Sequence, residues 1–177
     1  MSTNPQKKLQ ESLHQFYQGI KELNFRTTPE DYYYTSIEEF ILKEGVSFSL
    51  TPLNAEEKII VKTSLSRCGK EIKKKLCFHN SQCLMIYDDT NKIKYIEGFA
   101  FLRAYIPILH GWNTINGKVI DITFERYLKE GDTNFGKAYL GVEIKKKLIV
   151  DKIMKTGKSS VFIDNREEAY PVLKRKF

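Results

Sequence analysis

A candidate thiol triad is the most distinctive chemical feature of this 177-residue sequence. Residues 107–124 contain two extended runs around Asn116-Gly117, a dipeptide typical of a two-residue β-hairpin turn. The first run carries His110 and the second carries Asp121. Several thiol enzymes present a base and its orienting carboxylate on such a hairpin. We therefore expect Asp121 to accept a hydrogen bond from the His110 ring, which would fix the tautomer and orientation of that ring.

Cys77 is the candidate nucleophile. The apolar run 84–86 predicts a buried helix over residues 78–87, which leaves Cys77 at the helix N-terminus. A thiol attacks a carbonyl as the thiolate, and both a helix N-terminus and a neighbouring imidazolium favour that form. His110 supplies the imidazolium if the hairpin packs across the helix end. The alternative is that Cys77 is a small buried hydrophobic residue, as most free cysteines are.

Three further residues are candidates to support this triad. Asn80 and Gln82 are candidate hydrogen-bond donors to an oxyanion, together with backbone N–H groups at the helix start. Core packing or capping is the alternative for both. Trp112, the only tryptophan, is expected to pack over the hairpin and shield the bond between His110 and Asp121 from water. For His110 itself, the alternative is a hydrogen-bonded structural histidine.

The remaining cysteines and histidines favour structural roles. Cys83 falls in mid-helix and Cys68 falls at a helix C-terminus, where the helix dipole disfavours a thiolate. His14 and His79 fall on predicted helix surfaces. The sequence lacks the C-x-x-C and H-x-x-x-H pairs typical of zinc sites, and it lacks P-loop, dinucleotide-binding and zinc-deaminase patterns. We therefore expect no metal site and no cofactor.

The elements that must position the triad follow an α+β order. Helical spacing and capping signals predict N-terminal helices over residues 5–24, 36–43 and 55–67, with a short strand over 46–50. The strand section follows the helix that contains Cys83. Residues 94–102, 107–115 and 118–124 form an antiparallel meander, 125–137 form an ordered loop, 139–144 add a strand, and a last helix ends at Thr156-Gly157. N-terminal helices packed on an antiparallel sheet are the arrangement of papain-like and transglutaminase-like thiol enzymes.

Length and composition indicate a single domain over residues 1–177, with a helical N-terminal part (1–70) and a catalytic-core-like part (71–165). Three cysteines do not make a disulfide framework, no apolar run is long enough for a bilayer, and the N-terminus lacks a secretory signal. We therefore expect a cytoplasmic protein with no membrane partner.

A net charge of +7 and lysine clusters at 73–75, 145–147 and 174–176 could mark an acidic partner or nucleic acid. We favour the interpretation that these lysines lie on solvated helix faces, because charge alone is weak evidence for a partner and the sequence contains no nucleic-acid-binding motif.

Several short blocks resemble a sparsely characterised family of bacterial and phage proteins. The blocks are Cys77–Ser81, Tyr95–Ala100, Pro107–Asn113 and Gly117–Thr123, and they match the patterns C-[FY]-x-N-[AS], Y-x-E-G-[YF]-A, H-[AG]-W and G-K-V-x-D-x-T in one order. The resemblance spans residues 74–165, and residues 1–70 have no counterpart in it. The H-x-W and D-x-T blocks also resemble the His and Asp segments of transglutaminase-like and papain-like enzymes. This resemblance implies the triad order Cys77, His110, Asp121. Gly111 replaces the commoner alanine of the pattern, a small change that we expect to leave the triad undisturbed.

The sequence therefore predicts a cysteine-dependent acyl-transfer enzyme that works through a thioester. Its substrate would be a protein or another amide or ester. Hydrolysis by a peptidase, amidase or deamidase and transfer to an amine by a transglutaminase-like enzyme both remain open. One alternative is a non-enzymatic phage or mobile-element protein that binds and blocks a host factor. The other is a basic protein that binds nucleic acid.

Overall fold

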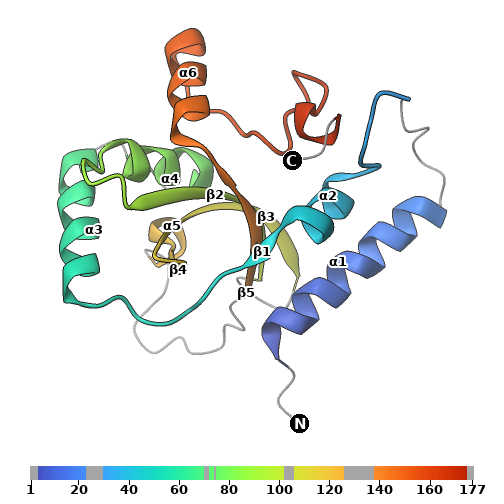
Figure 1. The fold of residues 1–177 in the computed structure, drawn as a ribbon, viewed down its shortest axis with the longest axis horizontal. Coiled ribbons are helices and arrows are strands. Elements are labelled where there is room, and N and C mark those ends of the chain that lie inside the picture. Colours follow the sequence, from blue (N-terminus) through green and yellow to red (C-terminus); the bar gives the residue numbers. More distant parts are fainter. Residues whose placement is uncertain are drawn as a thin grey trace.

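The structure, a computed structural model, describes residues 4–22, 30–69, 72–73, 75–101, 106–125 and 138–174. Within these residues the fold is α+β, with helices packed on a curled antiparallel sheet of five strands in the order β1-β5-β2-β3-β4 (Figure 1). The helices are α1 (Pro5–Glu22), α2 (Ile37–Glu44), α3 (Ala55–Cys68), α4 (Cys77–Ile86), α5 (Ile122–Glu125) and α6 (Lys146–Thr156), followed by a 3-10 turn at Pro171–Leu173. The strands are β1 (Val46–Ser47), β2 (Ile93–Phe101), β3 (Pro107–Ile115), β4 (Lys118–Ile120) and β5 (Ala138–Ile144).

Strands β2, β3 and β4 form the antiparallel meander that the sequence predicts. Asn116 and Gly117 have φ angles of 51° and 75°, the pair of positive values that a type I′ hairpin turn requires. β2 pairs with β3 from Ile93 to Phe101, and β5 pairs with the other edge of β2. β2 is therefore the central strand of the sheet.

The predicted strand over residues 118–124 is wrong in its second half, because β4 ends at Ile120. The carboxylate of Asp121 accepts a hydrogen bond of 2.9 Å from the backbone N–H of Phe124, which is the bond of a helix N-cap. The short helix α5 begins at the next residue. Asp121 therefore stands at a corner between strand and helix. The ordered loop expected over residues 125–137 lies outside the described residues from residue 126 onward.

The segment after β1 joins the two edges of the curled sheet. The N–H of Phe48 still bonds to Tyr139 in β5 (3.3 Å), whereas the N–H of Ser49 bonds to Gly117 in the hairpin turn (3.1 Å). The strand expected over residues 46–50 is therefore short, since the chain leaves β5 to reach the opposite edge. A small core fills the concave side that this segment closes, and it consists of Ile96, Ala100, Trp112, Phe124 and Tyr139.

The larger core lies on the other face of the sheet, under α1, α2, α4 and α6. α1 and α2 pack against β5, while α4 packs against β3 and β2, so the two groups of helices lie at opposite ends of this face (Figure 1). Caps define where the helices begin. The Ser36 side chain caps α2, and Asn54 and Glu57 form the capping box that the sequence predicts for α3.

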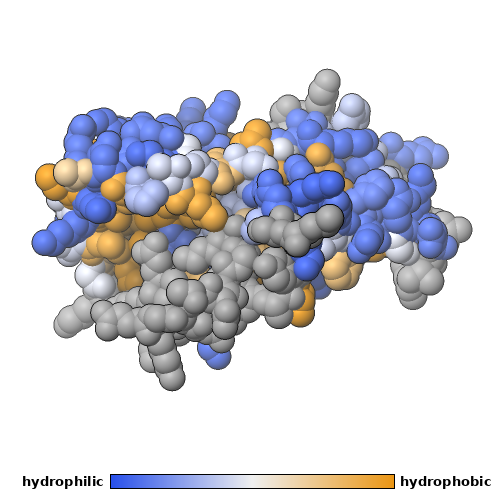
Figure 2. Space-filling view, turned by 90° about the horizontal axis from the view of Figure 1, so that it is seen from below, coloured by the Kyte–Doolittle hydropathy of each residue, from blue (hydrophilic) through white to orange (hydrophobic). Residues whose placement is uncertain are grey.

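Hydrophilic residues cover much of the face in Figure 2, with hydrophobic residues exposed between them. The largest exposed fractions among bulky apolar side chains belong to Met154 (82%) and Ile59 (65%), which lie on different helices. Among the described helices, none combines the length and the apolar character needed to span a bilayer.

Candidate active site

Cys77 is the first residue of α4, and its side chain is half-buried. The helix is largely buried, and no side chain caps its N-terminus. The first N–H groups of a helix have no carbonyl partner within the helix, so this end favours a negative charge on the Cys77 sulfur. The chain before the helix is held by Asn80, whose side chain bonds to both the N–H and the carbonyl of Lys73 (2.8 and 2.7 Å).

Gly111 allows α4 to lie close against β3. A Cβ atom at this position would lie 2.8 Å from Cδ1 and 3.0 Å from Cα of Phe78, the residue after Cys77. One turn further along α4, the Ser81 hydroxyl donates a hydrogen bond of 3.0 Å to the Gly111 carbonyl. These contacts bring the start of α4 next to the strand residue that follows His110. Glycine at position 111 suits this packing, because the helix backbone occupies the space that the methyl group of an alanine would need.

His110 and Asp121 form a buried hydrogen-bonded pair. His110 Nε2 lies 2.7 Å from Asp121 Oδ2, and both residues are at most 3% exposed. The same oxygen accepts the hydroxyl of Tyr139 at 3.0 Å, and the other oxygen caps α5 through Phe124. Three separate donors therefore fix the Asp121 carboxylate, which in turn fixes the orientation of the imidazole.

The Cys77 side chain lies close enough to the His110 ring to raise the pKa of that ring. Asp121 occupies Nε2, so Nδ1 is the ring nitrogen that can face the sulfur. Burial lowers the pKa of His110, but the interactions with Asp121 and with Cys77 outweigh burial and raise this pKa from 6.5 to about 9. An imidazole with this pKa is protonated at neutral pH, and a thiolate beside it gains a cationic partner.

Trp112 covers the pair on the concave side of the sheet. Its ring lies nearly parallel to the His110 ring, with 6.3 Å between the centroids and 14° between the planes, and it is fully buried. Gly141 makes room for the indole, because a Cβ atom there would lie 2.6 Å from Cη2 of Trp112. The tryptophan therefore packs beside the histidine, on the side of the sheet where Phe124 and Tyr139 also lie.

Asn80 and Gln82 lie in the core with their amide nitrogens already occupied. The Asn80 amide donates to Lys73 and to the Thr123 hydroxyl, and the Gln82 amide donates to the Tyr95 hydroxyl and to the Ser160 carbonyl. Both side chains are fully buried. These bonds favour the structural alternative for both residues and leave the backbone N–H groups of α4 as the donors available for an oxyanion.

The other cysteines and histidines lie apart from this group. Cys68 and Cys83 are buried in the core. The Cys83 sulfur lies 3.6 Å from Nε2 of His79, whose Nδ1 lies 2.9 Å from the Ser159 hydroxyl, so His79 has partners within the fold and is not an isolated surface residue. In the part of the chain that the structure describes, no three His, Cys, Asp or Glu side chains are grouped so as to hold a metal ion.

The lysine clusters include residues with defined acceptors. Lys146 donates to the Asp88 carbonyl (3.2 Å) and to the Asn91 side chain (2.9 Å), and Lys174 pairs with Asp31 at 3.0 Å. These two lysines thus bind acceptors within this chain.

Two features of the site were not identified from the sequence. Tyr139 comes from β5, where the sequence predicts only a strand. Tyr139 and Gly141 are two residues apart, so the predicted strand already places them on the same face of the sheet. Glu97 lies under the site, fully buried, and accepts hydrogen bonds from the Tyr95 hydroxyl and from the N–H groups of Phe162 and Ile163. An acidic residue in the middle of an otherwise apolar strand is unusual, and it indicates a buried carboxylate with hydrogen-bond partners.

The chain matches no protein-family model, no curated protein and no solved structure in these three comparisons.

Proposed function

We propose that this chain is a cysteine-dependent acyl-transfer enzyme in which Cys77 is the nucleophile, His110 the general base and acid, and Asp121 the residue that orients His110. One observation carries the proposal. A cysteine at an uncapped helix N-terminus lies beside an imidazole, close enough to raise its pKa, and a buried carboxylate holds the Nε2 atom of that imidazole. This is the relation of nucleophile, base and orienting group that covalent catalysis requires.

The reaction proceeds in two halves. In the reactive form the proton of the Cys77 thiol already resides on His110, and the thiolate attacks the carbonyl carbon of an amide or ester. The tetrahedral intermediate collapses when the bond from carbon to nitrogen or oxygen breaks, and the leaving group takes the proton from His110. The product of this half is a thioester on Cys77. Water or an amine then attacks the thioester with His110 as base, and the thiolate of Cys77 leaves.

The parts around the triad suit this chemistry. The N–H groups at the start of α4 point toward the end of the helix where an oxyanion would form next to Cys77. Trp112 and the buried Asp121 keep water away from the far side of the imidazole. The arrangement is like that of papain-like and transglutaminase-like enzymes, and we extend the proposal to that class. Hydrolysis and transfer to an amine use the same first half.

Acetylation by p-nitrophenyl acetate tests the proposal directly. We expect a rapid release of nitrophenolate and one hydroxylamine-sensitive acetyl group, mapped by mass spectrometry to the peptide that contains Cys77. His110→Ala should slow the release at least about 100-fold, the usual contribution of general acid–base catalysis. Cys77→Ala should abolish it, while Cys68→Ala serves as the matched control with wild-type acetylation. Equal acetylation of all three cysteines, or of Cys77 with and without His110, would refute the proposal.

A further inference from the structure

A groove with a volume of about 380 Å³ lies between α6 and the segment that follows it, and we call it the α6 groove. Its apolar lining comes from β5, α6 and the C-terminal segment, and it consists of Ile144, Leu148, Phe162, Pro171 and Val172. Lys152, Lys155 and Glu168 are among the polar residues that complete the lining. Figure 1 shows α6 extending away from the sheet. Pockets that hold a small ligand have volumes of about 300–1,000 Å³, so the groove can take one large apolar side chain.

Contacts within the chain hold both walls of the α6 groove in place. The buried Glu97 carboxylate accepts the backbone N–H of Phe162 at 2.9 Å. Glu168 joins the two walls, because it pairs with Lys152 of α6 and also accepts a hydrogen bond of 2.8 Å from the Asn165 side chain. Since the walls are already fixed, filling the groove costs little conformational entropy.

The chain around α6 is strongly basic. Residues 145–158 contain six lysines and one acidic residue, Asp151. Lys146 and Lys152 bond to acceptors of this chain. The other four lysines are exposed, and they are Lys145, Lys147, Lys155 and Lys158. The positive charge of this segment and the net charge of +7 of the whole chain both favour a negatively charged partner.

Exposed apolar side chains accompany the lysines of α6. Met154 is 82% exposed, and Leu148 and Val150 are 52% and 37% exposed. Val150 and Met154 are four residues apart and share one face of the helix, whereas Leu148 lies on the face that lines the α6 groove. A phosphate backbone is bound by lysine and arginine rather than by apolar side chains, and a membrane surface requires the apolar side chains on a single face. The α6 surface therefore suits a protein segment better than nucleic acid or a bilayer.

We propose that the α6 groove binds an acidic peptide segment of a partner protein, which inserts one large apolar side chain into the groove. The apolar lining receives that side chain, and Lys155 and the exposed lysines beside it receive the carboxylates. A second copy of this chain would bring another net charge of +7 to the same surface, so like charge disfavours it as the partner. The groove lies outside the proposed triad, so the inference does not depend on the proposed acyl-transfer function.

An NMR titration of the isotopically labelled protein with acetyl-Glu-Glu-Phe-Glu-Glu-amide tests this inference. We expect the largest chemical-shift changes at the backbone amides of Leu148, Phe162 and Val172. Replacing the phenylalanine of the peptide with serine should weaken binding about 10- to 100-fold, the range for burial of a large apolar side chain. Replacing its glutamates with lysines should also weaken binding, because the exposed lysines of α6 would repel them.

Leu148→Glu is the decisive variant, because it puts a carboxylate into the groove in the first turn of α6, where an acidic residue suits the helix dipole. It should weaken binding of the phenylalanine peptide at least about 10-fold. Val150→Glu is the matched control, since it makes the same change of charge on the other face of α6, and it should retain most of the affinity. Leu148→Ser replaces Leu148→Glu if the NMR spectrum shows that the latter does not fold.

Lys155→Gln tests the contribution of charge. It should weaken binding about 2- to 5-fold, as expected for the loss of one exposed charge pair. Lys62→Gln, at an exposed position of α3, is the comparison and should bind like the wild type.

Equal affinities for the phenylalanine and serine peptides, or chemical-shift changes confined to residues outside the groove, would overturn the inference. Equal losses of affinity in Leu148→Glu and Val150→Glu would also overturn it, because the groove would then add nothing to the charge of α6. Cosedimentation with vesicles of phosphatidylcholine and phosphatidylserine tests the membrane alternative. Vesicle binding that Val150→Glu abolishes, together with no preference for the phenylalanine peptide, would assign the α6 surface to a membrane instead.

Discussion

Replacing Gly111 with alanine tests whether the close approach of α4 to β3 creates the site. The added methyl carbon would lie 2.8 Å from Cδ1 and 3.0 Å from Cα of Phe78, where ordinary contacts begin at 3.4 Å. The Phe78 ring can rotate, but its Cα belongs to the helix backbone. The start of α4 must therefore retreat by about half an ångström, a strain that corresponds to about 1–3 kcal/mol of lost stability.

The same retreat moves the Cys77 sulfur away from the His110 ring. Catalytic groups tolerate about 0.5 Å of misplacement, and 1 Å can cost about 100-fold in rate. We therefore expect Gly111→Ala to slow alkylation of Cys77 by iodoacetamide about 10-fold at pH 7. Thermal unfolding followed by circular dichroism should show a Tm lowered by about 3–10 °C, since 1 kcal/mol shifts Tm by about 2–4 °C in a protein of this size.

Gly19→Ala is the matched control. Gly19 lies in α1, and a Cβ atom there meets nothing within 4 Å. Alanine should stabilise this helix by about 1 kcal/mol and leave alkylation unchanged. If Gly111→Ala instead unfolds and alkylates like the wild type, the proximity of α4 and β3 does not set the geometry of Cys77 and His110, and the reasoning is refuted.

Three further predictions concern electrostatics and capping. Asp121→Asn should lower the pKa of His110 from about 9 toward 6.5, which two-dimensional NMR of the imidazole can follow; an unchanged pKa would mean that Asp121 does not stabilise the imidazolium. Burial raises the pKa of Glu97 from 4.5 to about 7 against the hydrogen bonds that it accepts, so its folded form binds a proton more readily than its unfolded form. The free energy of unfolding of the wild type, minus that of Glu97→Gln, should then be greatest below pH 4.5 and fall by about 3 kcal/mol as the pH rises to 7. Urea titrations in which this difference stays constant with pH would contradict the prediction. Asn54→Ala should cost about 1 kcal/mol by removing the N-cap of α3; Lys58→Ala, at an exposed position of the same helix, is the comparison in the same titrations.

The proximity of His110 to Asp121 could be predicted because a two-residue turn fixes strand register. Asn113 faces Ile120, so the same register continued would place Asp121 opposite Trp112, two residues from His110. The position of Cys77 followed from the apolar run of α4 for a similar reason, since a buried helix has to begin near its first apolar turn. Both predictions rest on residues that are close together in the sequence.

The conformation of Asp121 could not be predicted from local signals. Ile120, Ile122 and Phe124 alternate as they would in a strand, yet an aspartate such as Asp121 is also a preferred residue for a helix N-cap. The position of the Asp121 carboxylate is fixed by His110 and Tyr139, which lie on other strands and form hydrogen bonds with it.

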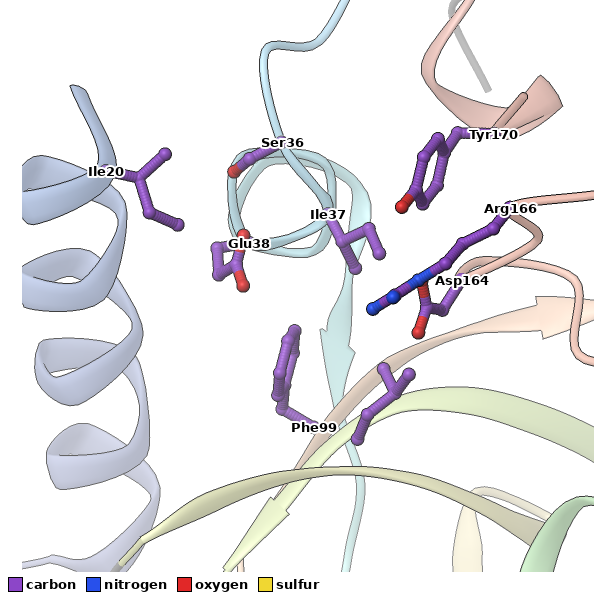
Figure 3. A pocket seen from close by; sticks show the side chains of 9 residues that line it. Ile20, Ser36, Ile37, Glu38, Phe99, Asp164, Arg166 and Tyr170 are labelled. Atoms are coloured by element: carbon purple, nitrogen blue, oxygen red, sulfur yellow. The ribbon is translucent and has the colours of Figure 1, made fainter. Parts of the chain in front are cut away.

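Distant segments also determine a cavity beside the sheet. α1, α2 and the segment around Asp164 line one cavity of about 360 Å³ although they lie far apart in the sequence (Figure 3), so no window of the sequence contains the cavity. Nor could the contact between Gly111 and Phe78 be predicted, because it depends on how closely a helix and a strand 30 residues apart pack.

The fold draws the proposed triad and the cavity from different parts of the chain, which has a consequence for the substitutions that each can accept. The triad residues all come from residues 77–121, one uninterrupted stretch, whereas the cavity takes walls from α1, α2 and the segment around Asp164. The hairpin turn is tied to the segment after β1 by Ser49, on the side away from those walls. The residues of the proposed triad and the residues that line this cavity therefore lie on separate pieces of sequence. Substitutions in α1, in α2 or near Asp164 can change the cavity without changing any residue of the proposed triad.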